Sequence, residues 1–109
     1  MDDQQLKPYL KLLQRFVTAA RADDCNTAWA MGNKNLHQAY GPKDAFCSKT
    51  LPAVAYIDLN LGRLEVQSPT YITLKLPHSQ SVAMYPGRGE SGPQIATTNL
   101  GTYEAEVAQ

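Results

Sequence analysis

The chain has 109 residues, of which 43% are hydrophobic and 18% charged. This length suits one domain with one core, and the composition is too apolar for a disordered chain. Ten basic residues balance ten acidic ones, so we expect no nonspecific binding of nucleic acid, which requires a concentrated basic field. A net charge near zero also lacks the electrostatic repulsion that keeps monomers apart, and therefore favours self-association.

The sequence contains no signal that predicts a membrane or secreted protein. Its start, MDDQQLKPYL, is acidic where a secretory signal is basic, and its apolar runs are shorter than the roughly 18 residues of a membrane span. We therefore expect a cytoplasmic protein with no membrane partner. Cys25 and Cys47 are too sparse for a disulfide framework and lack the spacing of paired zinc ligands, so we predict two reduced, partly buried thiols.

Residues 6–21 carry the strongest helical pattern, because their apolar side chains recur on one face at a period of 3.6 residues. We expect this helix to begin near residues 5–7, so that Pro8 lies in its first turn. The opposite face carries a basic stripe of Lys7, Lys11 and Arg15. Such a stripe is typical of the solvated side of an amphipathic helix, and contact with an acidic partner is the alternative.

A second helix is predicted to begin after Asp23 or Asp24, either of which can accept hydrogen bonds as an N-cap. It ends at Gly41-Pro42, where we expect glycine to form a left-handed cap. The segment 32–35, GNKN, leaves two possibilities open: one continuous helix, or two shorter ones. A further short helix can begin at Pro42.

From residue 53 the apolar period changes from 3.6 to 2, which predicts an antiparallel meander of strands at 53–59, 63–67, 71–76 and 81–85. The alternation in residues 103–107 fits a fifth strand, although a short helix is the alternative there. The predicted fold is one α+β domain over 1–109, with two or three N-terminal helices packed on one face of a four- or five-stranded sheet. Its parts are a helical layer over 1–50, the meander over 51–85, and a Gly-rich loop with a C-terminal strand or tail over 86–109.

The segment MYPGRGESGP contains G-x-G-x-x-G at Gly87, Gly89 and Gly92. A dinucleotide-binding fingerprint uses these glycines to turn from a strand into a helix that holds the pyrophosphate. Here Pro93 follows the third glycine and no amphipathic helix begins. We therefore interpret the segment as a turn-rich loop and predict no cofactor.

Strand register supplies the candidate polar site. If the first two predicted strands pair with their apolar residues on one face, Asp58 lies directly opposite Glu65 on the other face. The same logic on the next hairpin places Val66 opposite Ile72, and Thr73 beside Glu65. The sequence thus predicts one polar sheet face as the candidate site. Its residues are Tyr56, Asp58, Glu65, Tyr71 and Lys75, and Arg63 shares the same surface.

Metal binding and nucleophilic catalysis find little support in the sequence. His37 and Cys25 differ by about 120° in helix phase, so a site with Cys47 and His78 is not expected. Asp58 and Glu65-Val66-Gln67 follow part of a metal-dependent nuclease pattern, but Gln67 occupies the place of its lysine. We predict no metal and no catalytic residue.

These observations favour a non-catalytic protein-interaction module of accessory, immunity or regulatory type, acting through a sheet face, an edge strand or its tail. Its expected partner is another protein or a second copy in a homodimer, with no nucleic acid. The alternative is a small-molecule-binding domain or minor enzyme whose pocket between helices and sheet uses Asp58 and Glu65. A metal-dependent nuclease is a third, weaker hypothesis.

Overall fold

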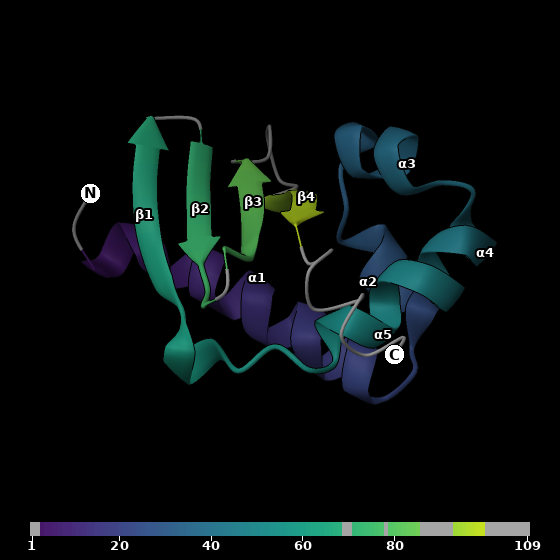
Figure 1. The fold of residues 1–109 in the computed structure, drawn as a ribbon. Coiled ribbons are helices and arrows are strands. Elements are labelled where there is room, and N and C mark those ends of the chain that lie inside the picture. Colours follow the sequence, from purple (N-terminus) through teal and green to yellow (C-terminus); the bar gives the residue numbers. More distant parts are fainter. Residues whose placement is uncertain (1–2, 69–70, 78, 86–92, 100–109) are drawn as a thin grey trace.

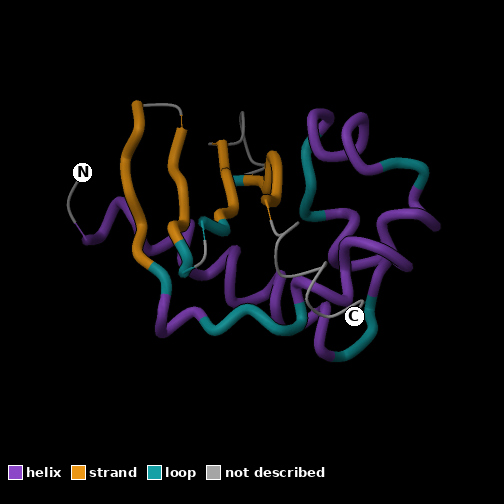
Figure 2. Tube along the Cα trace, in the orientation of Figure 1, coloured by secondary structure: helices purple, strands orange, loops and turns teal. Residues whose placement is uncertain are grey.

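The computed structural model describes residues 3–68, 71–77, 79–85 and 93–99. Helices precede an antiparallel sheet, as the sequence predicts for an α+β fold (Figures 1 and 2). The α-helices are α1 (Asp3–Arg21), α2 (Cys25–Ala30), α3 (Lys34–Tyr40), α4 (Lys43–Ala45) and α5 (Leu51–Val54), with a π-helix at Phe46–Thr50 and a 3-10 turn at Leu59–Leu61. The strands are β1 (Arg63–Ser68), β2 (Tyr71–Lys75), β3 (Ser81–Tyr85) and β4 (Gln94–Asn99).

The sheet is a meander in the order β1-β2-β3-β4, with antiparallel neighbours. The predicted register of the β1–β2 hairpin is confirmed: Leu64 pairs with Leu74, and Glu65 with Thr73. Three of the predicted strands therefore form where the alternation placed them. The fourth strand of the sheet is β4, in a segment that the sequence did not identify as a strand.

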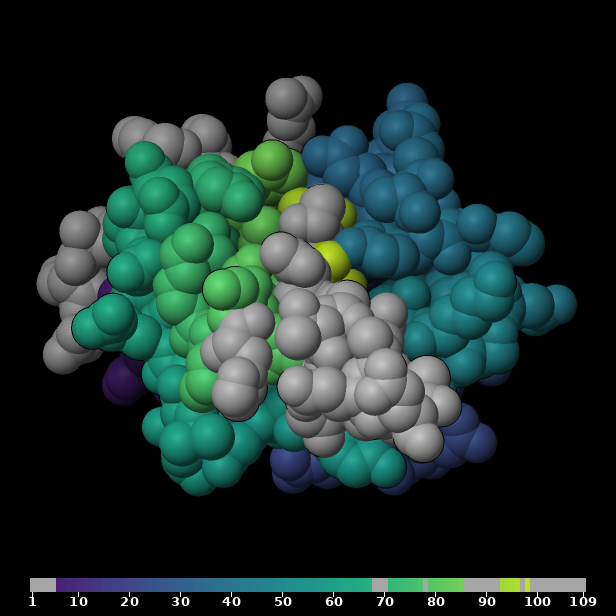
Figure 3. Space-filling view, in the orientation of Figure 1, coloured from purple at the N-terminus to yellow at the C-terminus, as the bar shows by residue number. Residues whose placement is uncertain are grey.

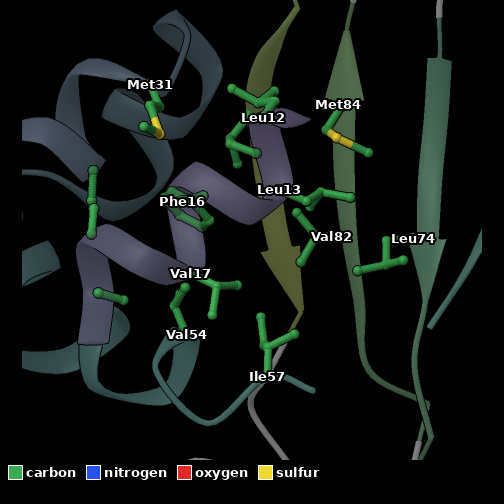
Figure 4. Close-up of a cluster of buried hydrophobic side chains, with 14 of the residues drawn as sticks. Leu12, Leu13, Phe16, Val17, Met31, Val54, Ile57, Leu74, Val82 and Met84 are labelled. Carbon is green, nitrogen blue, oxygen red and sulfur yellow. The ribbon is translucent and has the colours of Figure 1, made fainter. Parts of the chain in front are cut away.

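One face of the sheet packs on α1, which crosses behind the strands (Figure 1). Leu13 and Phe16 of α1 are fully buried, and Leu13 points toward Val82 and Met84 of β3 (Figure 4). The same cluster includes Val54 and other residues from the later helices. Helices and strands thus share one continuous core on this face of the sheet. We call the opposite face outward; its middle residues, Thr73 and Ala83, are also buried, whereas Arg63 and Lys75 at its end are exposed.

The strand predicted at 53–59 was wrong: Ala53 and Val54 end α5, and the following residues connect it to the 3-10 turn that begins at Leu59. Buried Leu51, Val54 and Ile57 recur every third residue, as on one face of a helix. An apolar run this short also fits the alternation of a strand, and sequence periodicity cannot separate the two. The helical layer therefore extends to Val54 rather than ending at residue 50, and the sheet begins at Arg63.

Pro52 explains the π-helix that precedes α5. Proline has no N–H, and in a regular α-helix its ring collides with the carbonyl group four residues earlier. Before Pro52 the backbone hydrogen bonds span five residues instead of four: the Leu51 N–H donates to the carbonyl oxygen of Phe46. The widened turn lets the helical path continue through the proline.

The second predicted helix is divided into α2 and α3 at residues 31–33. Asp24 caps α2 and Asn33 caps α3, each with a side-chain oxygen that accepts a backbone N–H three residues on. The left-handed cap predicted at Gly41 was wrong: its φ is −72° and its ψ 166°. Glycine fits there because a Cβ atom would lie 2.5 Å from the carbonyl oxygen of His37.

Cys25 and Cys47 form a disulfide, which contradicts the prediction of two reduced thiols. The bond joins the first turn of α2 to the π-helix, and their Cα atoms lie 5.7 Å apart. Sequence spacing could not reveal this pair, because the proximity arises from the packing of the helices around Trp29 and Phe46. The bond also excludes both sulfurs as metal ligands while it is intact.

Some predicted features lie outside the described residues: the G-x-G-x-x-G segment, His78 and the possible strand at 103–107. The residues directly after the glycine segment are described, and Gln94 begins strand β4 where a dinucleotide fingerprint requires a helix. None of the described helices combines the length and hydrophobicity needed to cross a membrane.

Candidate functional site

The predicted polar site is divided between two places in the structure. Glu65, Tyr71 and Lys75 lie on the outward face of the β1–β2 hairpin, as predicted from the register. Tyr56 and Asp58 lie in the connection between α5 and β1 instead. The hairpin that would place Asp58 opposite Glu65 does not form, so these two carboxylates are not a strand pair.

Figure 3 shows the molecule from the outward side of β1, β2 and β3. On this face a pair of tyrosines and a pair of cations lie at opposite ends of β2. Tyr71 and Tyr85 lie opposite each other on β2 and β3, with ring centroids 5.3 Å apart. At the other end of the hairpin Arg63 lies directly opposite Lys75. Two cations in adjacent positions repel each other, so this corner of the sheet favours a nearby carboxylate.

The Glu65 carboxylate makes only weak contacts within its own chain. Its Oε1 lies 4.0 Å from Arg63 Nη2, and the Arg63 side chain is 81% exposed. The Gln67 side-chain amide donates to Glu65 Oε2 at 3.5 Å. Because exposed ion pairs of this length contribute little to stability, both charged groups remain available to a partner.

The two edges of the sheet differ. At β4, the Ile95 N–H donates to the Met31 carbonyl oxygen, and the Asn33 N–H donates to the Ile95 carbonyl oxygen. Tyr40 adds a hydroxyl hydrogen bond to the Thr98 carbonyl. The α2–α3 link and α3 therefore cover this edge. Among the described residues no strand pairs with the outer edge of β1.

Val66 marks the open edge. It shares the inward face with Leu64, yet it is 44% exposed because β1 is the outermost strand. The alternation in the sequence predicts this strand but not its position at the edge, since strand order depends on long-range pairing. The alternation in the sequence does not reveal β4. Because β4 pairs with β3, β1 is the edge strand at the opposite end of the sheet.

Tyr56 and Asp58 line a pocket of about 200 Å³ with Leu61, Leu76 and Gln80. Asp58 accepts the Asn60 N–H at 2.9 Å and thereby caps the 3-10 turn. The side-chain Nε2 of Gln80 is buried and has no hydrogen-bond partner within the described part of the chain. The lining of this pocket thus combines apolar and polar side chains, as in sites that hold small molecules.

A shallower apolar groove of about 330 Å³ lies between α1 and α2, lined by Arg15, Ala19 and Met31 among others. Across the described ranges, no group of three or more His, Cys, Asp or Glu side chains is arranged to hold a metal ion. No protein-family model matches the sequence, and neither the curated proteins nor the solved structures compared with it include a significant match.

Proposed function

We propose that this protein is a non-catalytic interaction module that binds another protein chain through the edge of β1. The observation that carries the proposal is the contrast between the two edges of the sheet. The α2–α3 link covers β4, whereas no described strand pairs with the outer edge of β1. An edge strand presents alternate N–H and C=O groups that can pair with an added strand. Natural proteins usually block such edges unless they use them.

Side chains beside the edge supply selectivity in this proposal. Val66 offers an exposed apolar contact on the inward face, while Arg63 and Glu65 offer opposite charges on the outward face. A bound strand places alternate residues on these two faces, so its sequence must match both.

The test uses peptides of random sequence displayed on phage and selected on the folded protein. Selected peptides should bind with NMR shift changes centred on residues 63–68. Val66→Lys should abolish this binding, because a charge at an edge strand opposes pairing. Leu61→Lys is the matched control, since Leu61 is 62% exposed but lies outside β1. Binding that maps elsewhere, or that Val66→Lys leaves intact, would contradict the proposal.

A second candidate function is binding of a small molecule in the Tyr56–Asp58 pocket. The lining of the pocket favours it, because the polar residues Asp58 and Gln80 lie there among the apolar side chains of Leu61 and Leu76. A screen of small carboxylates and amides by NMR should give shift changes around Gln80 that Gln80→Leu removes. If no compound perturbs this pocket, the candidate fails.

The compartment remains a prediction. The sequence predicts the cytoplasm, whereas disulfides such as Cys25–Cys47 persist mainly in oxidising compartments. Trapping thiols with an alkylating reagent at the moment of cell lysis decides between them. Alkylation of both cysteines would support the cytoplasm, and an intact bond would oppose it.

A further inference from the structure

We infer that the chain bound at the β1 edge is a second copy of this protein, paired antiparallel so that Leu64 lies opposite the partner's Leu64. This inference rests on the proposed function, because it uses the same edge. It adds the identity of the partner and the register of the two strands. The result is a two-fold symmetric dimer with one continuous sheet.

Side-chain alternation limits the possible registers. If both helical layers lie on the same side of the joined sheet, inward residues must lie opposite inward residues. In a two-fold arrangement this condition requires that one residue of β1 lies opposite its own copy. Leu64, Glu65 and Val66 are the candidates, because they lie in the middle of the described strand.

Charge selects among the three registers. Centring on Glu65 places the two Glu65 carboxylates opposite each other, which is destabilising. Centring on Val66 places Glu65 opposite the partner's Gln67 and forms no pair of opposite charges. Centring on Leu64 places Arg63 opposite the partner's Glu65, and it does so twice because of the symmetry. This register alone gives complementary charges.

The Leu64 register also relieves the repulsion within each chain. Arg63 has Lys75 directly opposite on its β2 side and a 4.0 Å contact to its own Glu65. The partner's Glu65 would lie on the open side of Arg63. Its carboxylate would then offset the repulsion between the Arg63 guanidinium and the Lys75 ammonium group. On the inward face, half-buried Leu64 would lie against the partner's Leu64 and extend the core of each subunit across the joint.

Charge reversal tests the register directly. Arg63→Glu places a second carboxylate opposite the partner's Glu65, and Glu65→Arg places two guanidinium groups opposite each other, so each variant should self-associate at least about tenfold more weakly than wild type. An equimolar mixture of the two variants restores opposite-charge pairing across the joint and should form a heterodimer of near wild-type affinity. Light scattering and sedimentation velocity at low ionic strength measure the self-association of each variant and the heterodimer formed in the mixture.

Two controls accompany the mixture. Arg15→Glu makes the same charge change as Arg63→Glu at an exposed position of α1, outside the sheet, and should leave the dimer unaffected. Circular dichroism of each variant establishes that it is folded. Recovery in the mixture cannot come from contacts within one chain, because each variant carries only one sign of charge at these two positions.

Wild-type protein that stays monomeric at the highest concentration reached would overturn the inference, as would a mixture no more associated than its components. The phage experiment separates this failure from that of the proposed function. If the protein is monomeric but peptides still bind in a Val66-dependent way, the edge binds a different protein. If neither occurs, both proposals fail.

Discussion

Gly32 and Ile95 form an isolated parallel bridge between the α2–α3 link and the outer side of β4. Through it a helical connection occupies the backbone groups that an edge strand otherwise exposes. The break between α2 and α3 thus has a structural role, because a continuous helix would keep its N–H and C=O groups within itself. With the Tyr40–Thr98 hydrogen bond the bridge covers the β4 edge, and no described strand pairs with the outer edge of β1.

Gly32→Ala should destabilise the protein by about 1–2 kcal/mol, because a small-to-large change in a packed region forces neighbours to move. A Cβ atom at Gly32 would lie 2.3 Å from Leu36 Cδ2 and 3.2 Å from its Cβ, and Leu36 is fully buried. Urea denaturation measures the loss. In a Leu36→Ala background the same substitution should cost less; equal costs in both backgrounds would show that the clash with Leu36 is not the cause.

Asp23→Gly should stabilise the protein by about 0.5–1 kcal/mol, because a residue with a Cβ atom is disfavoured in the left-handed region. Asp23 has a φ of 56° and ends α1, where its N–H donates to Ala20 and the Asp24 N–H donates to Ala19. This is the pattern of a Schellman cap, in which glycine is preferred. The thermal midpoint should rise for Asp23→Gly and fall for Asp23→Val, and a fall for both would contradict this reasoning.

The sequence predicts β1, β2 and β3 well because each carries its own alternation, which local pairing across short turns then enforces. It fails at residues 53–59 because the spacing of Leu51, Val54 and Ile57 fits a helical face, while Ala55, Ile57 and Leu59 also alternate as in a strand. The choice between them depends on packing against α1, which no local pattern contains.

The candidate site was predictable to the same extent. Glu65, Tyr71 and Lys75 share the outward face because their register follows from the hairpin. Asp58 was placed with them only through the strand that does not form. The open edge of β1 depends on β4 and on the Gly32–Ile95 bridge, which join segments distant in the sequence.

Reduction of the Cys25–Cys47 disulfide should lower the free energy of unfolding by about 3 kcal/mol, since a cross-link over a loop of this length restricts the unfolded chain. The two cysteines are 22 residues apart. Urea denaturation with and without reductant measures the difference, and a thiol reagent should find no free thiol in the unreduced protein. Cys25→Ala/Cys47→Ala is the control, whose stability should not respond to reductant. An unreduced wild type with two reactive thiols would refute the prediction.

Stability should fall in acid partly through Asp24, whose pKa is held below its ordinary value of 3.8 by hydrogen bonds from the Thr27 hydroxyl and from the Thr27 backbone N–H. Because the folded pKa is lower than the unfolded one, the unfolded chain binds this proton more tightly. The stabilisation is therefore complete above the unfolded pKa and is lost as the pH falls through the folded one. Asp24→Asn keeps a capping side chain but cannot titrate. The urea midpoint of wild type should exceed that of Asp24→Asn at neutral pH, and the gap should close in acid; a gap independent of pH would assign the difference to something other than the Asp24 charge.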